Sequence, residues 1–201
     1  MFGIPPACEL KKQLPKKTIY AKFHLNAAQR DSFDKDIARI DIVAVISPAT
    51  IPALALGEEE VGELYVLHVH LKHKEYDSRN IALLSKLIPQ KMVFALHCDK
   101  ETQFAVFHTK LLMSTWQDSE QAALPISGLN IDSVWENIVK NIGLIEVDED
   151  KTLVEQIAAN DQRDKTLAQI ARLQRKIANE KQSRRKREYF NQISNIKKQI
   201  P

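Results

Sequence analysis

The sequence predicts an α+β protein with a mixed or antiparallel sheet and a long C-terminal helix. Within residues 61–109, a β-branched and aromatic stretch precedes a helical apolar stripe and two further apolar runs, which predicts strand, helix, strand, tight turn and strand. An earlier strand, helix and strand within residues 18–46 complete the β-α-β-β-α-β element order of a ferredoxin-like sheet, with one added hairpin strand and helices on one face. From Asp150 to Ile200 the chain has no Gly or Pro, which permits an uninterrupted helix. The strand order stays open, because a mixed sheet of another topology has the same element order.

Charge is divided unevenly along the chain. The formal net charge is +3, but residues 150–201 hold 13 Lys and Arg against 6 Asp and Glu, a net +7. The preceding residues 1–149 hold 16 against 20, a net −4. We therefore expect an α+β domain over residues 1–149 and a long basic, coiled-coil-like helix over residues 150–201.

The composition favours a soluble cytoplasmic protein without membrane association. A chain of 201 residues with 44% hydrophobic residues can bury one ordinary core. The two cysteines, Cys8 and Cys98, have no metal-type spacing, which suits a reducing compartment better than a disulfide framework. Residues 1–6 do not resemble a signal peptide, and no apolar run approaches the roughly 18 residues of a membrane span.

In the N-terminal part, residues 1–15 are expected to form an irregular arm. The alternation of Thr18–Phe23 predicts the first strand. Asn26 followed by Gln29 resembles a capping box, and the helix that it begins is expected to end near Arg39. The β-branched run from Ile40 to Ile46 predicts the second strand.

The central strand begins at Val61 and carries Tyr65, Leu67, Val69 and Leu71 on one face. Asp77 and Ser78 can cap the next helix, which Pro89 ends. Lys91–Cys98 and Thr102–Thr109 then predict an antiparallel hairpin around a short polar turn. Further on, Asn130 or Asp132 can cap a helix whose inward residues are Ile131, Val134, Trp135, Ile138 and Ile142, with Gly143 just beyond its end.

A helix of 51 residues would be about 75 Å long, far more than one small domain can cover. We therefore expect it to project and to pair. An apolar heptad seam, whose phase shifts around Ile170, Leu173 and Ile177, predicts a homodimer. The seam residues that we assign to oligomerisation are Leu153, Ile157, Leu167, Tyr189, Ile193, Ile196 and Ile200. The alternative is that the helix folds back and covers this stripe within its own chain.

A basic stripe and cluster on the same helix is the candidate nucleic-acid-binding surface. Its residues are Arg172, Arg175, Lys176, Lys181, Arg184, Arg185, Lys186 and Arg187. Such a pattern fits phosphate contact. A solvated face supported by i,i+4 ion pairs, such as Asp161 with Lys165 and Glu180 with Arg184, explains it as well, and this interpretation is favoured.

His68, His70 and His97 are weak candidates for a metal site. His68 and His70 share one face of a strand at i,i+2, and His97 would share a face with His108 if Cys98 opposes Gln103. Zinc requires three or four such ligands converging on one point. No C-x-x-C or H-E-x-x-H motif supports a metal here, so structural histidines and no cofactor are expected.

Several short motifs resemble a bacterial family of unknown function. These motifs are Leu14-Pro15-Lys16-Lys17, the segment from Ile37 to Thr50, the strand from Val66 to Leu71, and Leu87-Ile88-Pro89 followed by Met92–Leu96. The resemblance covers about residues 14–110 and brings no catalytic residues. It implies genes located beside DNA methyltransferase and helicase genes of restriction or phage-defence type.

No catalytic signature is recognisable, so the leading hypothesis is a non-enzymatic accessory or adaptor protein of such a system. We expect it to dock a larger nucleic-acid enzyme, a DNA methyltransferase or helicase, and to contact DNA through its basic helix. One alternative is a metal-dependent nuclease that uses the histidine face of the sheet. Another is a structural coiled-coil spacer.

Overall fold

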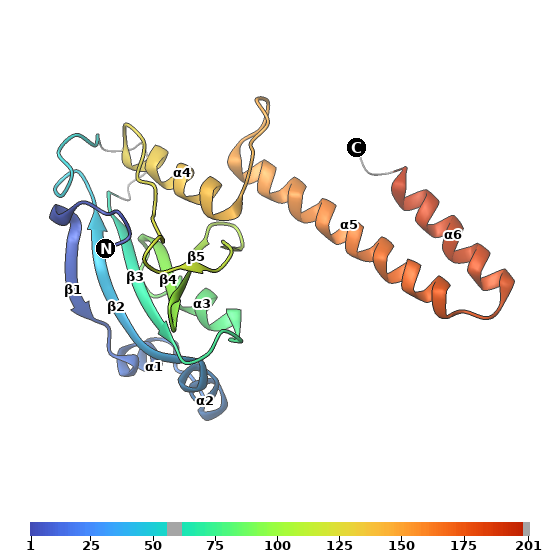
Figure 1. The fold of residues 1–201 in the computed structure, drawn as a ribbon, viewed down its shortest axis with the longest axis horizontal. Helices are drawn as coiled ribbons and strands as arrows, with labels where there is room; N and C mark the ends of the chain where they lie inside the picture. Colours follow the sequence, from blue (N-terminus) through green and yellow to red (C-terminus); the bar gives the residue numbers. More distant parts are fainter. Residues whose placement is uncertain (56–61, 199–201) are drawn as a thin grey trace. The chain divides into compact units, whose positions relative to one another are not determined.

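The computed structural model describes residues 1–55 and 62–198, arranged as two compact units, Met1–Ile145 and Glu146–Pro201 (Figure 1). Val61, predicted to begin the central strand, and Ile200, predicted to end the seam, lie outside the described residues. No helix in the described ranges is long and apolar enough to cross a membrane.

The first unit is built on one sheet, to which the described residues contribute seven strands in the order β1-β2-β3-β4-β5-β6, with β7 paired to β5. The strands are β1 (Glu9–Gln13), β2 (Ile37–Ile46), β3 (Leu64–Leu71), β4 (Lys91–Cys98), β5 (Glu101–Phe107), β6 (Leu111–Met113) and β7 (Gln117–Asp118). The β3–β4 pair is parallel and the other pairs are antiparallel.

The α+β class and the mixed sheet are confirmed, whereas the ferredoxin-like strand order is not. A split β-α-β unit leaves room for another strand between its two strands. Here β1 and β2 are direct antiparallel neighbours, and every strand from β1 to β6 lies beside its neighbour in sequence. The strands β1 to β6 therefore lie in the sheet in the same order as in the chain, unlike those of a ferredoxin-like sheet.

Helices α1 (Lys16–Phe23), α2 (Ala27–Asp36) and α3 (Ser78–Leu84) cover one face of this sheet. Their buried contributions come from Ile19, Phe33 and Ile81, each with no exposed surface. They pack in one cluster with alternate residues of the central strands, which are Leu67, Val69 and Leu71 of β3 and Met92, Phe94, Leu96 and Cys98 of β4. The apolar face predicted for the central strand is therefore confirmed.

The predicted strand at Thr18–Phe23 is wrong, because these residues lie in α1. Ile19 and Phe23 are four residues apart, which places both on the inner side of a helix. The first strand is β1, within the arm predicted to be irregular. All five of its residues are exposed, so its sequence carries no apolar alternation.

The capping box of Asn26 and Gln29 is confirmed at the start of α2. The helix ends at Asp36, three residues before the predicted end. The buried Asp36 carboxylate accepts hydrogen bonds from the Asp77 backbone N–H at 2.8 Å and from Asn80 Nδ2 at 2.9 Å. This carboxylate therefore joins the end of α2 to the start of α3.

The N-terminal segment, with a 3-10 turn at Pro6–Cys8, and helix α4 (Ile131–Gly143) lie on the opposite face. Asn130, one of the two predicted caps, accepts from the Ser133 backbone N–H at 2.8 Å. All the residues predicted to face inward are buried. Gly143 is the last helical residue rather than the one beyond it, and a Cβ there would lie 2.7 Å from Ile145 Cδ1 and 3.3 Å from Leu112 Cδ1 of β6. This close approach lets α4 pack on the sheet.

The second unit is a helical hairpin of α5 (Leu153–Asn179) and α6 (Ser183–Lys197), as Figure 1 shows. The predicted long C-terminal helix is confirmed by the 27-residue α5, but it is not uninterrupted: the backbone is extended at Glu180, with φ −81° and ψ 136°. The Glu180 carboxylate accepts from the backbone N–H groups of Lys181 and Gln182 at 2.9 and 3.0 Å, which replaces helical hydrogen bonds.

A small apolar cluster closes the hairpin. Ile170 and Leu173 of α5 are buried against Ile193 of α6. Ile177, Tyr189 and Ile196 are partly buried around them. The predicted seam therefore belongs to two helices rather than to one. The apolar stripe of α5 faces the apolar stripe of α6 across the turn, which explains why the heptad phase is not continuous between them.

We predict that Phe94→Ala will lower the free energy of unfolding of the first unit by about 3–5 kcal/mol, because Phe94 is fully buried in the centre of the sheet. Urea unfolding followed by tryptophan fluorescence measures this, since both tryptophans lie in that unit. The control Leu129→Ala, at a side chain that is 86% exposed, should stay within about 0.5 kcal/mol of the parent. Equal losses for the two variants would contradict the assignment of the core.

Candidate functional site

The structure brings together the three histidines that the sequence identified as weak metal candidates. In the parallel β3–β4 pair, His70 lies opposite His97 and His68 lies opposite Ala95. The ring centroids are 4.2 Å apart for His68 and His70, 5.3 Å for His68 and His97, and 5.7 Å for His70 and His97. We call these three residues the histidine cluster.

Polar side chains from three other strands or loops border the histidine cluster. Ser119 Oγ is 3.1 Å from His97 Nδ1 and 2.8 Å from Thr102 Oγ1. On the other side, Asp41 Oδ2 is 3.5 Å from His70 Nε2, and Asp41 Oδ1 accepts from Arg39 Nε at 2.9 Å. The sequence did not identify Ser119 as a neighbour of the histidine cluster. Ser119 follows β7, and this strand of two residues is too short to show a periodic pattern.

The pairing of Cys98 with Gln103, considered above as a condition, does not form. Cys98 lies opposite Glu101, and His97 lies opposite Thr102. Cys98 packs with the helices on the other face of the sheet, so it is not a partner of its neighbour His97. His108 lies beside α4, where its Nδ1 accepts from Trp135 Nε1 at 3.3 Å.

Burial keeps His68 uncharged at neutral pH. His68 is only 8% exposed, and its Nε2 has no hydrogen-bond partner within the part of the chain that the structure describes. This burial, together with the nearby His70 and His97, lowers the pKa of His68 to about 4. Burial also lowers the pKa of His70, against the opposing effect of Asp41. Phe2 covers the cluster, with its ring centroid 5.5 Å from that of His68.

The geometry of the cluster supports hydrogen bonding more directly than metal binding. Across residues 1–55 and 62–198, no group of three or more His, Cys, Asp or Glu side chains is arranged to hold a metal ion. His68, His97, Thr102 and Ser119 instead border a cavity of about 360 Å³, roofed in part by Phe2. Neutral imidazoles and hydroxyls can each donate or accept there.

The basic residues singled out in the sequence lie on the α5–α6 hairpin. Arg172, Arg175 and Lys176 of α5 line a surface hollow of about 390 Å³ together with Tyr189 of α6. The Lys176 ammonium is 5.7 Å from the centroid of the Tyr189 ring. Lys181 belongs to the turn, and Arg184, Arg185, Lys186 and Arg187 follow in the first turns of α6.

Most of these cations are exposed, and two of them have acidic neighbours. Arg184 lies 3.5 Å from Glu188, and Arg185 lies 3.8 Å from Glu180. The predicted pair of Asp161 and Lys165 is present at 2.7 Å, whereas Glu180 pairs with Arg185 rather than with Arg184. Exposed pairs of this kind add little stability, so the cations stay available to an external anion.

The residues assigned to oligomerisation are distributed differently along the hairpin. Ile193 is buried in the hairpin cluster, with Tyr189 and Ile196 at its edge. Leu153 and Ile157 are buried, whereas Leu167 is 49% exposed. The α6 part of the seam is therefore covered within the chain by α5.

Fold and site together define a class: a mixed α+β sheet protein that carries a histidine cluster around the buried His68, and a cationic helical hairpin in its second unit. The chain belongs to the family described as Domain of unknown function (DUF4391), whose model matches residues 2–200. This confirms the predicted membership of an uncharacterised family. No curated protein and no solved structure matches the chain.

We predict that acid will destabilise the first unit through His68. Its pKa is about 4 in the folded protein and near 6.5 when unfolded, so the unfolded state binds more protons between these values. The stability contributed by neutral His68 is present above pH 6.5 and is lost as the pH falls. Between pH 7.5 and pH 5 the loss should be about 2 kcal/mol.

Urea unfolding at the two pH values tests this, with His68→Gln expected to show a smaller difference between them. His24→Asn is the matched control, because His24 is exposed and asparagine tolerates its left-handed backbone, with φ 48°. The same pH dependence in the parent and in His68→Gln would show that another group is responsible.

Proposed function

We propose that this protein is a non-enzymatic, cytoplasmic accessory of a DNA restriction or phage-defence system. In this proposal it docks a larger nucleic-acid enzyme, a DNA methyltransferase or helicase, and contacts DNA through the α5–α6 hairpin. The observation that carries the proposal is the gathering of cations from two helices on a unit with little core of its own. The choice of system is supported by the short motifs that resemble a bacterial family, because that resemblance implies genes located beside DNA methyltransferase and helicase genes.

The charge of the hairpin suits a polyanion. Residues 150–201 carry a net +7, whereas the rest of the chain carries a net −4. Arg172, Arg175 and Lys176 come from α5, and Arg184, Arg185 and Arg187 come from α6, so the hairpin carries cations on both sides of the turn at Glu180. Lysine and arginine side chains on an exposed surface bind phosphates without reading base sequence.

The exposed apolar side chains of the hairpin favour a protein partner as well. Phe190 is 58% exposed and Leu167 is 49% exposed, although both are large. We propose that these side chains contact the larger enzyme or a second copy of the chain. A homodimer through Ile193 is disfavoured, because Ile193 already packs against α5.

The two alternatives have less support. The metal-dependent nuclease needs a ligand set that the described residues do not provide. The coiled-coil spacer needs a free apolar seam, and α5 covers the α6 part of it. The spacer, in addition, does not account for the excess of cations on both helices.

We predict that the protein binds a duplex of about 20 base pairs with weak sequence dependence, because phosphate contacts dominate. The logarithm of the association constant should fall with the logarithm of salt concentration by about 0.9 for each neutralised phosphate. The triple variant Arg184→Glu, Arg185→Glu, Arg187→Glu should abolish binding measured by fluorescence anisotropy. Replacement of the same three residues by Gln should weaken it without adding repulsion to Glu180 and Glu188.

The matched control is Lys11→Glu, Lys12→Glu, Lys17→Glu, which changes the net charge equally at exposed lysines of the first unit. Circular dichroism should show that each variant keeps its helices. Binding that survives the arginine changes with an unaltered salt slope would place the DNA contact elsewhere. A pull-down from native cells that recovers no methyltransferase, helicase or other nucleic-acid protein would count against the docking role.

A further inference from the structure

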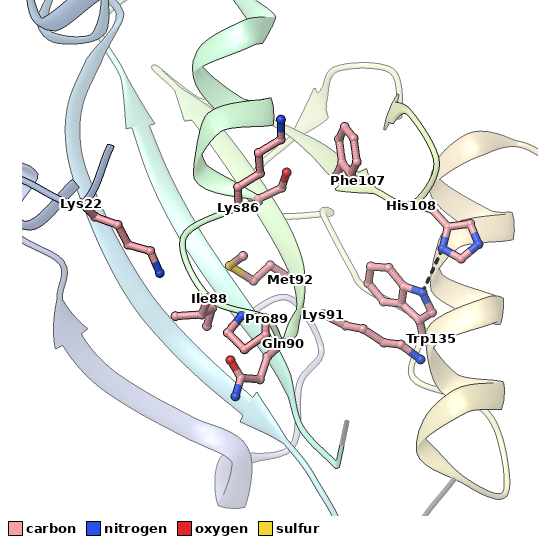
Figure 2. A pocket seen from close by; sticks show the side chains of 11 residues that line it. Lys22, Lys86, Ile88, Pro89, Gln90, Lys91, Met92, Phe107, His108 and Trp135 are labelled. Atoms are coloured by element: carbon pink, nitrogen blue, oxygen red, sulfur yellow. Dashed lines mark hydrogen bonds between the residues drawn. The ribbon is translucent and has the colours of Figure 1, made fainter. Parts of the chain in front are cut away.

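The cavity beside the histidine cluster has a volume of about 360 Å³. This volume is near the lower end of the range for small-molecule sites, which is about 300–1,000 Å³. One wall is the sheet, through His68 of β3, His97 of β4 and Thr102 of β5, and the others are the N-terminal segment and the loop after β7. It shares no described lining residue with the larger cavity at the start of β4, which Figure 2 shows.

Polar atoms of three side chains converge at this cavity. Ser119 Oγ lies 3.1 Å from His97 Nδ1 and 2.8 Å from Thr102 Oγ1. His97 Nδ1 also lies 3.5 Å from Thr102 Oγ1. Each hydroxyl group has one donor and two acceptor lone pairs, which these contacts do not use up. The two hydroxyl groups can therefore form further hydrogen bonds with a bound molecule.

His68 contributes a nitrogen without a partner to the same cavity wall. The side chain is more than nine-tenths buried, and in the described part of the chain its Nε2 has no hydrogen-bond partner. Buried polar atoms of this kind are rare in native structures, because each one lowers stability. The His68 ring centroid lies 5.3 Å from that of His97, so this nitrogen belongs to the same polar group as the Ser119 hydroxyl. A ligand that hydrogen-bonds Nε2 would remove the penalty.

The charges around the cavity suit an uncharged ligand. Burial lowers the pKa of His68 to about 4, so this ring is neutral near pH 7. None of the lining residues within the described ranges is Lys or Arg, and the Met1 ammonium lies 3.4 Å from the Glu9 carboxylate. Glu120, which also lines the cavity, carries a negative charge that would repel an anion.

An aromatic ring and small residues form the other side of the cavity. The Phe2 ring centroid lies 5.5 Å from that of His68, with the two rings nearly perpendicular. Phe2 has a φ of 53°, which bulky residues rarely adopt, and its carbonyl accepts from the Leu124 backbone N–H at 2.9 Å. Gly3 and Ala123 add small surfaces. A flat ring with polar edges matches this lining better than a polyol, whose hydroxyl groups would face apolar surface without partners.

We propose that this cavity binds an uncharged nitrogen heterocycle of nucleobase size, which hydrogen-bonds His68 Nε2 and the Ser119 hydroxyl with its edge and contacts Phe2 with its ring. Purine and pyrimidine edges carry both donors and acceptors, as neutral imidazoles and hydroxyl groups do. The inference goes beyond the proposed DNA contact of the hairpin, because it concerns the first unit and needs no phosphate. Two sources have this chemistry: a free base and the base of a nucleoside.

Titration of the full chain with adenine, uracil, their ribonucleosides, ribose and inorganic phosphate, followed through the histidine ring resonances by NMR, tests the proposal. We expect at least one of the two bases to bind with a Kd below about 1 mM, and ribose and phosphate to bind at least about tenfold more weakly. A nucleoside that binds as tightly as its base would assign the site to nucleosides, and a weaker nucleoside would assign it to free bases. No binding of either base up to about 5 mM, or tighter binding of ribose or phosphate, would overturn the proposal.

The variant His68→Phe keeps an aromatic ring beside Phe2 and removes Nε2. It should weaken binding of the base at least about fivefold, and the fold should persist because this nitrogen has no partner to lose in the described part of the chain. Ser119→Ala, in the loop after β7, should weaken binding at least about threefold and provides the same test if His68→Phe does not fold. The matched control Ser127→Ala removes an exposed hydroxyl outside the cavity and should change affinity less than about twofold. Unchanged affinity in both His68→Phe and Ser119→Ala would overturn the proposal.

Discussion

The parallel pairing of β3 with β4 is the constraint on which the rest of the sheet depends. Parallel neighbours need a crossover connection, so α3 must pass over the face that it covers with α1 and α2. The same register sets His70 beside His97 on the opposite face, where Phe2 and the loop after β7 border a cavity with His68 and His97. The loop between α3 and β4 also supplies Ile88, Pro89 and Gln90 to a cavity of about 620 Å³ at the start of β4.

Periodic apolar patterns explain which parts of the fold the sequence could predict. The central strands, the Asn26 capping box and the inward face of α4 each carry such a signal, and each was found. β1 carries none because all of its residues are exposed, and α1 was mistaken for a strand because its few apolar residues fit both periods. Ser119 reaches His97 only through the pairing of two short segments with β5, which depends on tertiary structure rather than on local pattern.

In the second unit, the stretch without Gly and Pro is compatible with a single long helix and with a helical hairpin. The absence of Gly and Pro favours a single helix, yet the apolar stripe changes phase between Ile177 and Tyr189. A hairpin satisfies both halves of the stripe, since Ile170 and Leu173 bury Ile193 without a second chain. The turn at Glu180 needs no glycine because its φ is negative, and the Glu180 carboxylate provides acceptors for the next two backbone N–H groups. The proposed DNA contact uses cations of both helices that this turn connects.

The distance between the two arms of the hairpin therefore tests the account most directly. Spin labels at Gln169→Cys and Ser194→Cys, with Cys8 and Cys98 replaced by Ala, report it by pulsed electron resonance; both labelled positions are exposed, and both native cysteines are buried. A hairpin predicts a distance below about 25 Å, because packed helices have axes about 10 Å apart. A distribution centred near about 38 Å, the length of 25 residues of continuous helix, would contradict the account.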